Sequence, residues 1–430
     1  MAVICKPLAE YKDTILNTGI RLECDDIPKK PIKRLIRFFK TIEDKRMENK
    51  IDYPLYEILL IAFFAIFSGA DTWTALADFG AVREKWLKKF LPLANGIPSH
   101  DTFRRVFALI NPEHLQKATV AFLIDNMKII KRAFHIPDSG LHQYCVDGKE
   151  STGTGRSKDA AKEIRNLHTL HVYDLSDGIC LVSKVIDSKT NEIPTAQEVL
   201  SAMQLKGTLV SFDALNTQTK TIAIIAEQKG DYIGALKGNQ HKFFEEVRLY
   251  FSDEKLKEIS SGKTNYHEER EKAHSCVETR KVYLTTDISW FADKANWPKL
   301  KGFLCYVKTV ENINTGKITT EYRYYIASLK DVELCADGIR GHWAVENQLH
   351  WNLDVNFDED NNMTVDRNAF QNFSLMNKLA LSLLKLVAPV VKKSIRATKK
   401  ISGWDPDRIM KILCALDEDI LANAMMNVKK

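Results

Sequence analysis

The stretch between residues 142 and 187 holds three runs of strand-forming residues, HQYCVDGKE (142–150), LHTLHVYDL (167–175) and ICLVSKVID (179–187). β-Branched and aromatic residues recur in these runs, and turn residues such as SDG at 176–178 separate them. This pattern is typical of strands that follow one another along the chain. We therefore expect three consecutive strands here.

After these strands the pattern alternates between helix and strand. The apolar spacing predicts a helix in PTAQEVLSAMQL (194–205), a strand in GTLVSFDAL (207–215), a helix in NTQTKTIAIIAEQKG (216–230) and a strand in DYIGALKG (231–238). The complete order, β-β-β-α-β-α-β, predicts an α/β fold with a ribonuclease H-like mixed sheet.

The remaining sequence adds segments before, within and after this core. A chain of 430 residues is too long for one ordinary hydrophobic core, so two or three domains are expected. Residues 53–135 are helical in pattern, and residues from about 255 to 326 become β-like again. We predict a basic N-terminal segment (1–50), a helical N-terminal domain (51–137), the first part of the ribonuclease H-like core (138–254), a β-rich insertion (255–326), the second part of the core with a closing helix (327–390), and a basic C-terminal tail with a short helix (391–430).

The composition, with 45% hydrophobic and 27% charged residues, is that of a globular protein. The longest apolar stretch, residues 58–70, is shorter than the roughly 20 residues that a membrane-spanning helix needs. We expect a buried helix there. The eight cysteines form no C-x-x-C pair, and no signal-peptide pattern opens the sequence. These features predict a protein of a reducing cytoplasm.

The net charge of +6 is unevenly distributed along the chain. Residues 28–50 contain nine lysines and arginines against three acids, and a second basic run covers residues 392–400. Basic faces attract nucleic acid, but most such runs are simply solvated. Charge alone therefore leaves DNA binding open.

Two aspartates occupy positions where strands rarely carry acids. Asp147 lies in the apolar run YCVDG, and Asp213 follows LVSF, which is apolar enough for a strand covered on both faces. Open α/β sheets bind ligands at the carboxyl ends of their strands, so both aspartates are candidates for one site. Neighbouring carboxylates repel each other unless a cation, a shared proton or a basic partner intervenes, and Mg²⁺ prefers such oxygen ligands.

The stretch GHWAVENQLHW (341–351) spaces His342, Glu346 and His350 four residues apart. On an α-helix they share one face, with the two histidines about 12 Å apart, too far to hold one ion together. A zinc-protease helix has its histidines one turn apart, so we do not expect zinc. The helix either packs as an amphipathic element or delivers Glu346 to a site completed elsewhere. We expect Trp343 and Trp351 to pack it against the sheet and the insertion.

The three acids together fit one chemistry. Three carboxylates that hold two metal ions about 3.5–4 Å apart can activate water or a 3′ hydroxyl and stabilise the leaving oxygen in phosphodiester cleavage. For each acid alone, a structural role such as capping a loop is the stronger explanation. Glu346 has competitors for the third position. We prefer it because it lies within a helix, whereas the acids that follow resemble a solvated turn, namely Asp354, Asp358, Glu359 and Asp360.

Several stretches resemble the DDE transposases of bacterial insertion sequences, in the branch that includes the H-repeat-associated proteins. They are VDGKE, KTNEIPTAQEVL, VSFDALNTQ, DYIGALKGNQ, RGHWAVENQLHWNLDVNFDED and RNAFQNFSLMNKLALSLL, in a consistent order along the chain. The resemblance implies that Asp147, Asp213 and Glu346 form a catalytic triad that binds Mg²⁺, or alternatively Mn²⁺. It also implies a helical N-terminal domain, for which DNA binding is expected, and a β-rich insertion before the glutamate helix.

Five polar residues are candidates for DNA phosphate contacts, namely Lys149, Lys237, Asn239, Gln240 and His350. Lys149 follows Asp147 by two residues and so shares its face of the strand. Residues 237–240 follow a strand that ends at the same sheet edge. Each candidate could instead belong to a solvated loop, a helix cap or, for the histidine, internal packing.

The expected function is Mg²⁺-dependent cleavage of double-stranded DNA at the inverted-repeat ends of a transposon, with transfer of a 3′ end into target DNA. Two alternatives stay open. One is a catalytically inactive, transposase-derived DNA-binding protein, and the other is a structure-specific nuclease of the same fold. Joining two ends predicts a homodimer assembled on DNA. Such an enzyme is expected in the bacterial cytoplasm, associated with the nucleoid.

Overall fold

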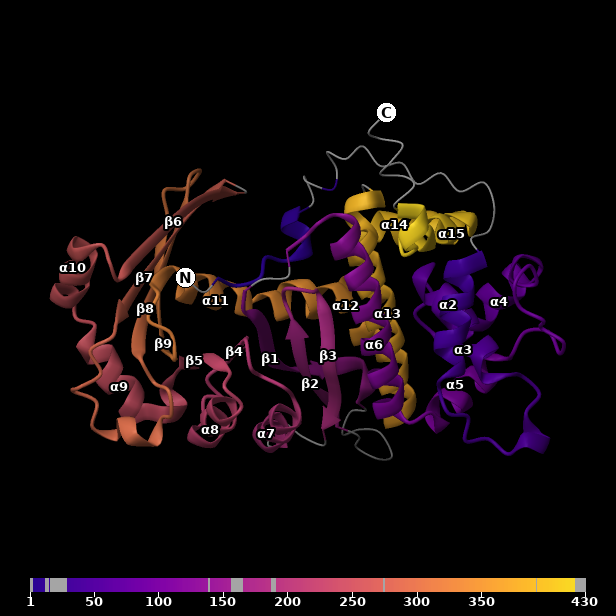
Figure 1. Cartoon of the computed structure of the whole chain (residues 1–430), viewed down its shortest axis with the longest axis horizontal. Helices are drawn as coiled ribbons and strands as arrows, with labels where there is room; N and C mark the ends of the chain where they lie inside the picture. The colour runs from indigo at the N-terminus through magenta and orange to yellow at the C-terminus, as the bar shows by residue number, and fades with distance from the viewer. Residues whose placement is uncertain are drawn as a thin grey trace. The chain divides into compact units, whose positions relative to one another are not determined.

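The computed structural model describes residues 3–11, 15, 29–137, 140–155, 165–186, 191–273, 275–391 and 393–421. Its strands are β1 (His142–Ser151), β2 (Leu167–Asp174), β3 (Ile179–Ile186), β4 (Thr208–Phe212), β5 (Asp231–Leu236), β6 (Tyr266–Ala273), β7 (Cys276–Thr285), β8 (Gly302–Asn312) and β9 (Ile318–Ala327). Its longer helices are α2 (Lys29–Lys40), α3 (Leu55–Phe67), α4 (Trp73–Leu87), α5 (His100–Leu109), α6 (Pro112–Ala133), α7 (Glu192–Ala202), α8 (Thr219–Glu227), α9 (His241–Tyr250), α10 (Asp253–Gly262), α11 (Val332–His342), α12 (Trp351–Phe357), α13 (Arg367–Val391), α14 (Ile395–Trp404) and α15 (Asp407–Cys414). Figure 1 shows where these elements follow one another along the chain.

The strands form one mixed sheet in the order β3-β2-β1-β4-β5-β9-β8-β7-β6. β2 and β3 are antiparallel, whereas β4 pairs in parallel with both β1 and β5. Helix α7 precedes β4, and α8 joins β4 to β5. This is the predicted order β-β-β-α-β-α-β, so the ribonuclease H-like α/β fold is confirmed. β9 pairs antiparallel with β5, and through it the strands of the predicted insertion continue the same sheet.

The chain divides into two compact units. The first comprises Met1–Cys5, Ser139–Asp147 and Lys189–Val345, and the second comprises Lys6–Asp138, Gly148–Ser188 and Glu346–Lys430. The boundary therefore passes through β1 and through the helical run that carries Glu346. The domain boundaries predicted from the sequence remain a prediction.

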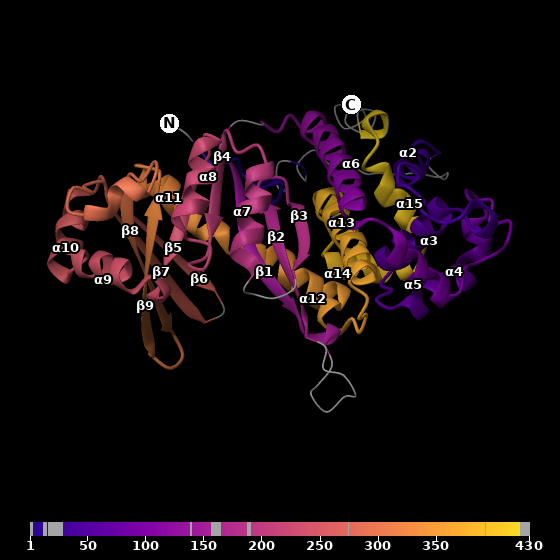
Figure 2. The ribbon, with the colours of Figure 1, turned by 90° about the horizontal axis from the view of Figure 1, so that it is seen from below.

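In the first unit, helices cover both faces of the strands. α11 packs on one face against β4 to β7, and α7 and α8 lie on the other, as Figures 1 and 2 show. The α11 backbone comes close to the strands at Gly338, where a Cβ atom would meet Ile233 Cδ1 at 2.5 Å and Leu209 Cδ2 at 2.9 Å. Glycine at this position thus lets the helix approach β4 and β5.

In the second unit, α13 packs against α3, α5, α6 and β3, as the predicted closing helix should. α3 is buried at every residue except Tyr56. This confirms the predicted buried helix, which ends at Phe67 and not at residue 70. The N-cap of α5 is Ser99, whose hydroxyl accepts from the Thr102 N–H. Among the described residues we find no helix with the length and apolarity to cross a membrane.

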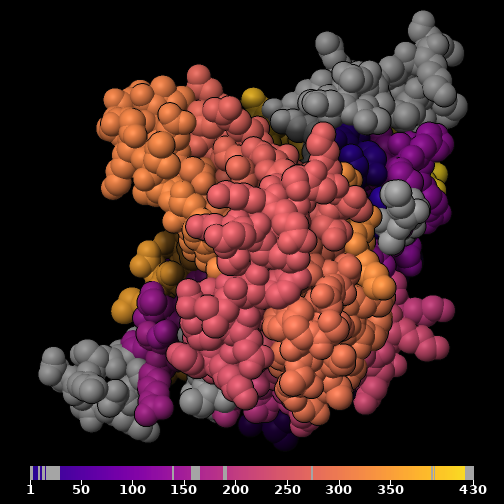
Figure 3. Space-filling model, turned by 90° about the vertical axis from the view of Figure 1, so that its left-hand side faces the viewer, coloured from indigo at the N-terminus to yellow at the C-terminus, as the bar shows by residue number. Residues whose placement is uncertain are grey.

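Two helices differ from the sequence-based expectation. The pattern predicts β structure from about residue 255, but α10 runs to Gly262, with Leu256 as its buried residue. A helix that buries so little shows hardly any apolar periodicity. α14 lies in the predicted tail, where a single short helix is expected. The surface around α9 and α10 faces the viewer in Figure 3. Residues 1–2, 12–14, 16–28, 392 and 422–430 of the predicted basic segments lie outside the described residues.

Candidate active site

Asp147 and Asp213 follow paired residues of two neighbouring parallel strands. In the register of β1 and β4, Cys145 pairs with Ser211 and Val146 pairs with Phe212. Each aspartate comes one residue later, so both lie at the same level of the sheet. Neighbouring strands are about 4.8 Å apart. The fold therefore brings these two predicted site residues together at one edge.

The side chains beside these aspartates show which face of the sheet they share. Gln143 Nε2 donates to the Gly338 carbonyl at 2.7 Å and to Ser211 Oγ at 3.0 Å, and Cys145 Sγ contacts the Gly341 carbonyl at 3.4 Å. These residues of β1 and β4 thus point towards α11. Since side chains alternate along a strand, Asp147, two residues after Cys145, points to the α11 face as well.

Asp213 accepts three hydrogen bonds on one oxygen. The backbone N–H groups of Leu215 and Asn216 each donate to Oδ1 at 3.1 Å, and the Asn216 side-chain amide donates to it at 3.3 Å. Burial raises the pKa of Asp213, nearby Glu192 adds to the rise, and the bonds from Asn216 and the charge of Lys237 oppose it. Within the described residues, Asp213 Oδ2 has no hydrogen-bond partner.

Two residues of this site, Glu192 and Asn216, were not predicted from the sequence. Glu192, at the start of α7, is 2% exposed and accepts from Asn216 Nδ2 at 2.8 Å. Asn216 therefore bridges the carboxylates of Glu192 and Asp213. The signal was present in the sequence, because both residues fall in stretches that carry the family resemblance, KTNEIP and FDALN.

Glu346 lies in a π-helical turn, Val345–His350, between α11 and α12. Its side chain is exposed and, within the described residues, forms no hydrogen bond or ion pair. A π-helical turn has more residues per turn than an α-helix. The prediction that His342, Glu346 and His350 share one face of a regular α-helix is therefore wrong from Glu346 onwards. Such turns are frequent at functional sites. No partner inside the described residues occupies this carboxylate.

His342 and His350 contact different strands. His342 Nδ1 lies 3.2 Å from Ser211 Oγ, and burial lowers the pKa of His342 to about 4. His350 Nε2 lies 3.0 Å from His171 Nδ1 of β2. The structure thus gives each histidine a protein partner. The predicted phosphate contact of His350 remains a prediction.

The acids that competed with Glu346 have partners of their own. Asp354 and Asp360 pair with Lys149 at 2.8 and 2.6 Å. Glu359 is 2% exposed and accepts from Ser374 at 2.9 Å, so the expectation of a solvated turn is wrong for this residue.

Lys237, Asn239 and Gln240 lie in the loop after β5. Lys237 is exposed. Asn239 donates to the Ala214 carbonyl at 2.7 Å, and Gln240 donates to the Thr217 carbonyl. The two amides thus fix this loop to the loop that follows Asp213. Their predicted DNA contacts remain predictions.

The two tryptophans of the motif behave differently. Trp343 packs edge-on against Tyr306 with ring centroids 5.8 Å apart, and the Arg323 guanidinium lies 4.9 Å above its ring. This confirms the expected packing against the insertion. Trp351 is 55% exposed, so the expectation that it packs the helix is wrong.

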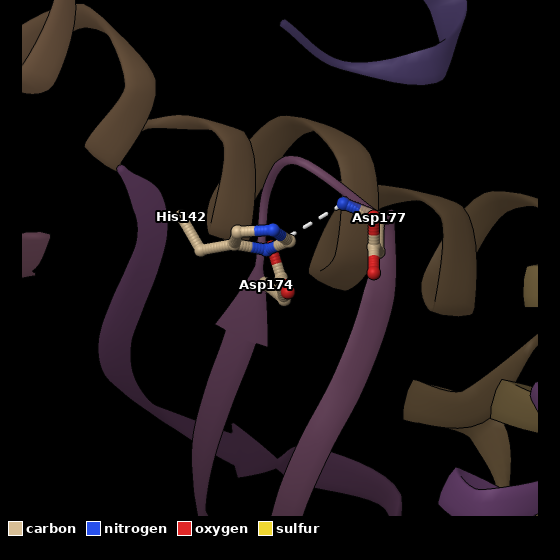
Figure 4. Close-up of side chains that lie close together, drawn as sticks. All are labelled: His142, Asp174 and Asp177. Atoms are coloured by element: carbon tan, nitrogen blue, oxygen red, sulfur yellow. Dashed lines mark hydrogen bonds between the residues drawn. The ribbon is translucent and has the colours of Figure 1, made fainter. Parts of the chain in front are cut away.

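Figure 4 shows three side chains of types that ligate metals: His142 at the start of β1, Asp174 at the end of β2, and Asp177 in the turn that follows. Asp174 Oδ1 accepts from the Ser176 N–H at 2.9 Å, and Lys131 Nζ lies 2.6 Å from Asp177 Oδ1. Both aspartates therefore have structural partners. His142 precedes Asp147 by five residues, about 17 Å along a strand, so it lies far from the aspartate edge.

The chain matches the family model of the transposase DDE domain over residues 139–383. A second model, described as DDE_Tnp_1-associated, matches residues 36–123. The chain therefore belongs to the transposase DDE domain family.

Its relatives include proteins of the H-repeat branch. The chain is 29% identical over 387 residues to the "H repeat-associated putative transposase YhhI" of Escherichia coli strain K12, covering 89% of this chain and 98% of the relative. It is 38% identical over 295 residues to the "Uncharacterized protein in dhlA 3'region" of Xanthobacter autotrophicus, covering 68% of this chain and 93% of that protein. A piggyBac transposase in a synaptic complex with hairpin DNA aligns at a TM-score of 0.40 and 9% identity, over 92% of this chain and 79% of that one. The sequence relatives confirm the predicted insertion-sequence branch.

Proposed function

We propose that this chain is a DDE transposase that cuts DNA at the ends of its element and joins a 3′ end to target DNA. Asp147, Asp213 and Glu346 would hold two Mg²⁺ ions. The observation that carries the proposal is the register of β1 and β4, which puts the first two carboxylates side by side. Membership of the transposase DDE domain family supports the reaction class.

The residues present fit a hard divalent cation. Carboxylate oxygens are the ligands that Mg²⁺ prefers, and Mn²⁺ accepts the same set. Burial raises the pKa of Asp213, and a bound cation would oppose this rise by favouring the ionised form. When bound, the two ions would activate the attacking oxygen and stabilise the leaving oxygen.

The remaining residues of the site orient these carboxylates and bind DNA. Asn216 fixes Asp213 from its backbone and its side chain. Lys237, exposed in the loop after β5, is proposed to contact a DNA phosphate, and Asn239 and Gln240 to hold that loop or share the contact. His350 remains a proposed phosphate contact, although it has a protein partner. For Lys149, which is paired with two carboxylates, the predicted phosphate contact is the alternative that the salt dependence of DNA binding tests.

The proposal also covers the oligomeric state and the location of the enzyme. Transfer of two transposon ends needs two active sites, which favours a homodimer on DNA. We also propose that the enzyme acts on double-stranded DNA at the bacterial nucleoid, in the cytoplasm.

Cleavage of labelled element ends in the presence of Mg²⁺ or Mn²⁺ tests the proposal. Asp147→Asn, Asp213→Asn and Glu346→Gln should each abolish cleavage and strand transfer while end binding persists. Glu258→Gln, which changes an exposed acid paired with Lys255, is the matched control and should cleave normally. Full activity of any triad variant would refute the assignment. Binding without cleavage by the unaltered protein would favour an inactive DNA-binding descendant, and cleavage without terminal repeats would favour a nuclease.

A further inference from the structure

Lys149 is a buried cation that joins strand β1 to the helical segment after Glu346. Its Nζ lies 2.8 Å from Asp354 Oδ1 and 2.6 Å from Asp360 Oδ1, and the residue is 7% exposed. Asp354 belongs to α12, and Asp360 belongs to the 3-10 turn Glu359–Asn361 that follows it. The two ion pairs therefore tie β1 to this part of the chain.

The charge of Lys149 is permanent at neutral pH. Burial acts to lower the pKa of Lys149, but the hydrogen bonds to Asp354 and Asp360 raise it above its ordinary value. A buried ammonium needs such carboxylates because it has lost its water. In this arrangement Lys149 acts as a fixed electrostatic link and does not exchange a proton.

A second, half-buried lysine, on α13, holds the same helical run. Lys385 Nζ donates to the Gln348 carbonyl at 2.6 Å and lies 2.9 Å from Tyr173 Oη. Tyr173 in turn donates to Gln348 Oε1 at 3.3 Å. Gln348 belongs to the π-helical turn that contains Glu346. The turn is thus held through both the backbone and the side chain of one residue.

The two residues of the Lys149–Asp354 pair each lie close along the chain to a proposed metal ligand. Lys149 follows Asp147 by two residues, about 7 Å along the same face of the strand. Asp354 follows Glu346 by eight residues, about two helical turns. The Lys149–Asp354 pair is therefore a short link between the strand of one ligand and the helix of another. Catalytic carboxylates tolerate displacements of only about 0.5 Å.

We propose that Lys149 is a positioning residue that holds the helical segment of Glu346 in place, through its ion pairs with Asp354 and Asp360. This inference rests on the proposed function. It differs from the phosphate contact expected from the sequence, because a lysine used in this way changes metal binding and leaves DNA affinity unaltered.

The affinity of the full chain for Mn²⁺ in the absence of DNA tests the proposal. Electron paramagnetic resonance measures it through the signal of the free ion. We expect Lys149→Met to weaken Mn²⁺ binding at least about tenfold, since small displacements of ligands are costly. In a Glu346→Gln background the same change should have no further effect, because the ligand that Lys149 positions is gone. End binding and its salt dependence should match those of the unaltered protein. Lys206→Met, at an exposed lysine outside this network, is the matched control.

The outcomes separate this inference from the proposed function. Unchanged Mn²⁺ affinity in Lys149→Met, or an equal loss in both backgrounds, overturns the positioning role. A reduced salt dependence of end binding assigns Lys149 to a phosphate contact and also overturns it. If Lys149→Met does not fold, Asp354→Asn replaces it, because this change keeps the side-chain shape and the pair between Lys149 and Asp360. Asp354→Asn should weaken Mn²⁺ binding, and it should have no further effect in the Glu346→Gln background. An unaltered protein that neither binds Mn²⁺ nor cleaves DNA refutes both proposals.

Discussion

The backbone and side-chain amides of Asn216 both donate to Asp213 Oδ1, at 3.1 and 3.3 Å. The same side-chain nitrogen donates to buried Glu192 at 2.8 Å. Asn216→Leu removes the side-chain donor at similar size and leaves two carboxylates without their shared partner. We expect metal-dependent cleavage to fall by about 10–100-fold, the usual cost of losing a residue that orients a metal ligand.

Steady-state cleavage at several Mn²⁺ concentrations measures this effect. Asn296→Leu, which removes an exposed amide bonded to Asp293, is the control and should behave as the unaltered protein. Equal activity of Asn216→Leu and this control would show that the bridge does not orient Asp213.

The burial of Asp213 is expected to lower the stability of the metal-free protein, and ion binding is expected to restore it. Burial raises the pKa of Asp213, so in the absence of metal its charged form costs stability at neutral pH. Asp213→Asn removes that cost, and we expect the melting temperature to rise by about 2 °C, on the scale of 2–4 °C per kcal/mol for domains of this size. Millimolar Mn²⁺ should stabilise the unaltered protein and leave the variant unchanged. Thermal melting with and without Mn²⁺ checks both statements. A variant that is less stable than the unaltered protein and still gains from Mn²⁺ would contradict them.

His342 should make the protein sensitive to mild acid. Burial lowers the pKa of His342 to about 4, below its ordinary value of 6.5. The unfolded chain therefore takes up a proton below about pH 6.5 that the folded chain does not. The contribution of His342 to stability is complete above pH 6.5 and is lost as the pH falls towards 4. Between pH 6.5 and pH 4, we expect His342 to lower the free energy of unfolding by about 1 kcal/mol or more, in addition to the loss caused by other groups.

Denaturant unfolding of His342→Gln at pH 7 and pH 5 isolates this contribution. The variant should be less stable at pH 7, because its contact with Ser211 is altered, but it should lose less stability on acidification. His114→Gln, at an exposed histidine, is the control. An identical loss in the His342 variant and the unaltered protein would assign the acid sensitivity to other groups.

The strands and most helices could be predicted because their patterns are local. The apolar run before Asp213 and the two-residue period around Cys145 are sufficient to predict β4 and β1, and the order of elements then places both aspartates at one sheet edge. α10 could not be predicted in this way, because it buries Leu256 and little else. The resemblance to a family supplied Glu346, which no period in the sequence connects to the aspartates.

The parts of the site that escaped prediction depend on distant partners. Lys149 has the sequence surroundings of an exposed strand end, and its burial follows from Asp354 and Asp360, more than 200 residues later. The π-helical turn likewise has an ordinary helical sequence. Its carbonyl at Gln348 is satisfied by Lys385 of α13, a contact that only the tertiary structure reveals.

Lys237 offers a direct test of DNA contact at the aspartate edge. It is exposed, it lies in the loop after β5, and within the described residues it forms no ion pair. If it neutralises one phosphate, Lys237→Ala should weaken end binding and reduce the slope of log affinity against log salt by about 0.9. Asn239→Ala removes an uncharged donor from the same loop, so it should change affinity without changing that slope.

Titrations of a labelled element end at four or more salt concentrations give both quantities. Lys206→Ala, at an exposed lysine before β4, should leave affinity and slope as they are. An unchanged slope in Lys237→Ala would show that this ammonium does not meet a phosphate in the bound complex. A loss of cleavage with an unchanged slope would instead indicate that Lys237 acts on Asp213, whose pKa its charge lowers in the structure.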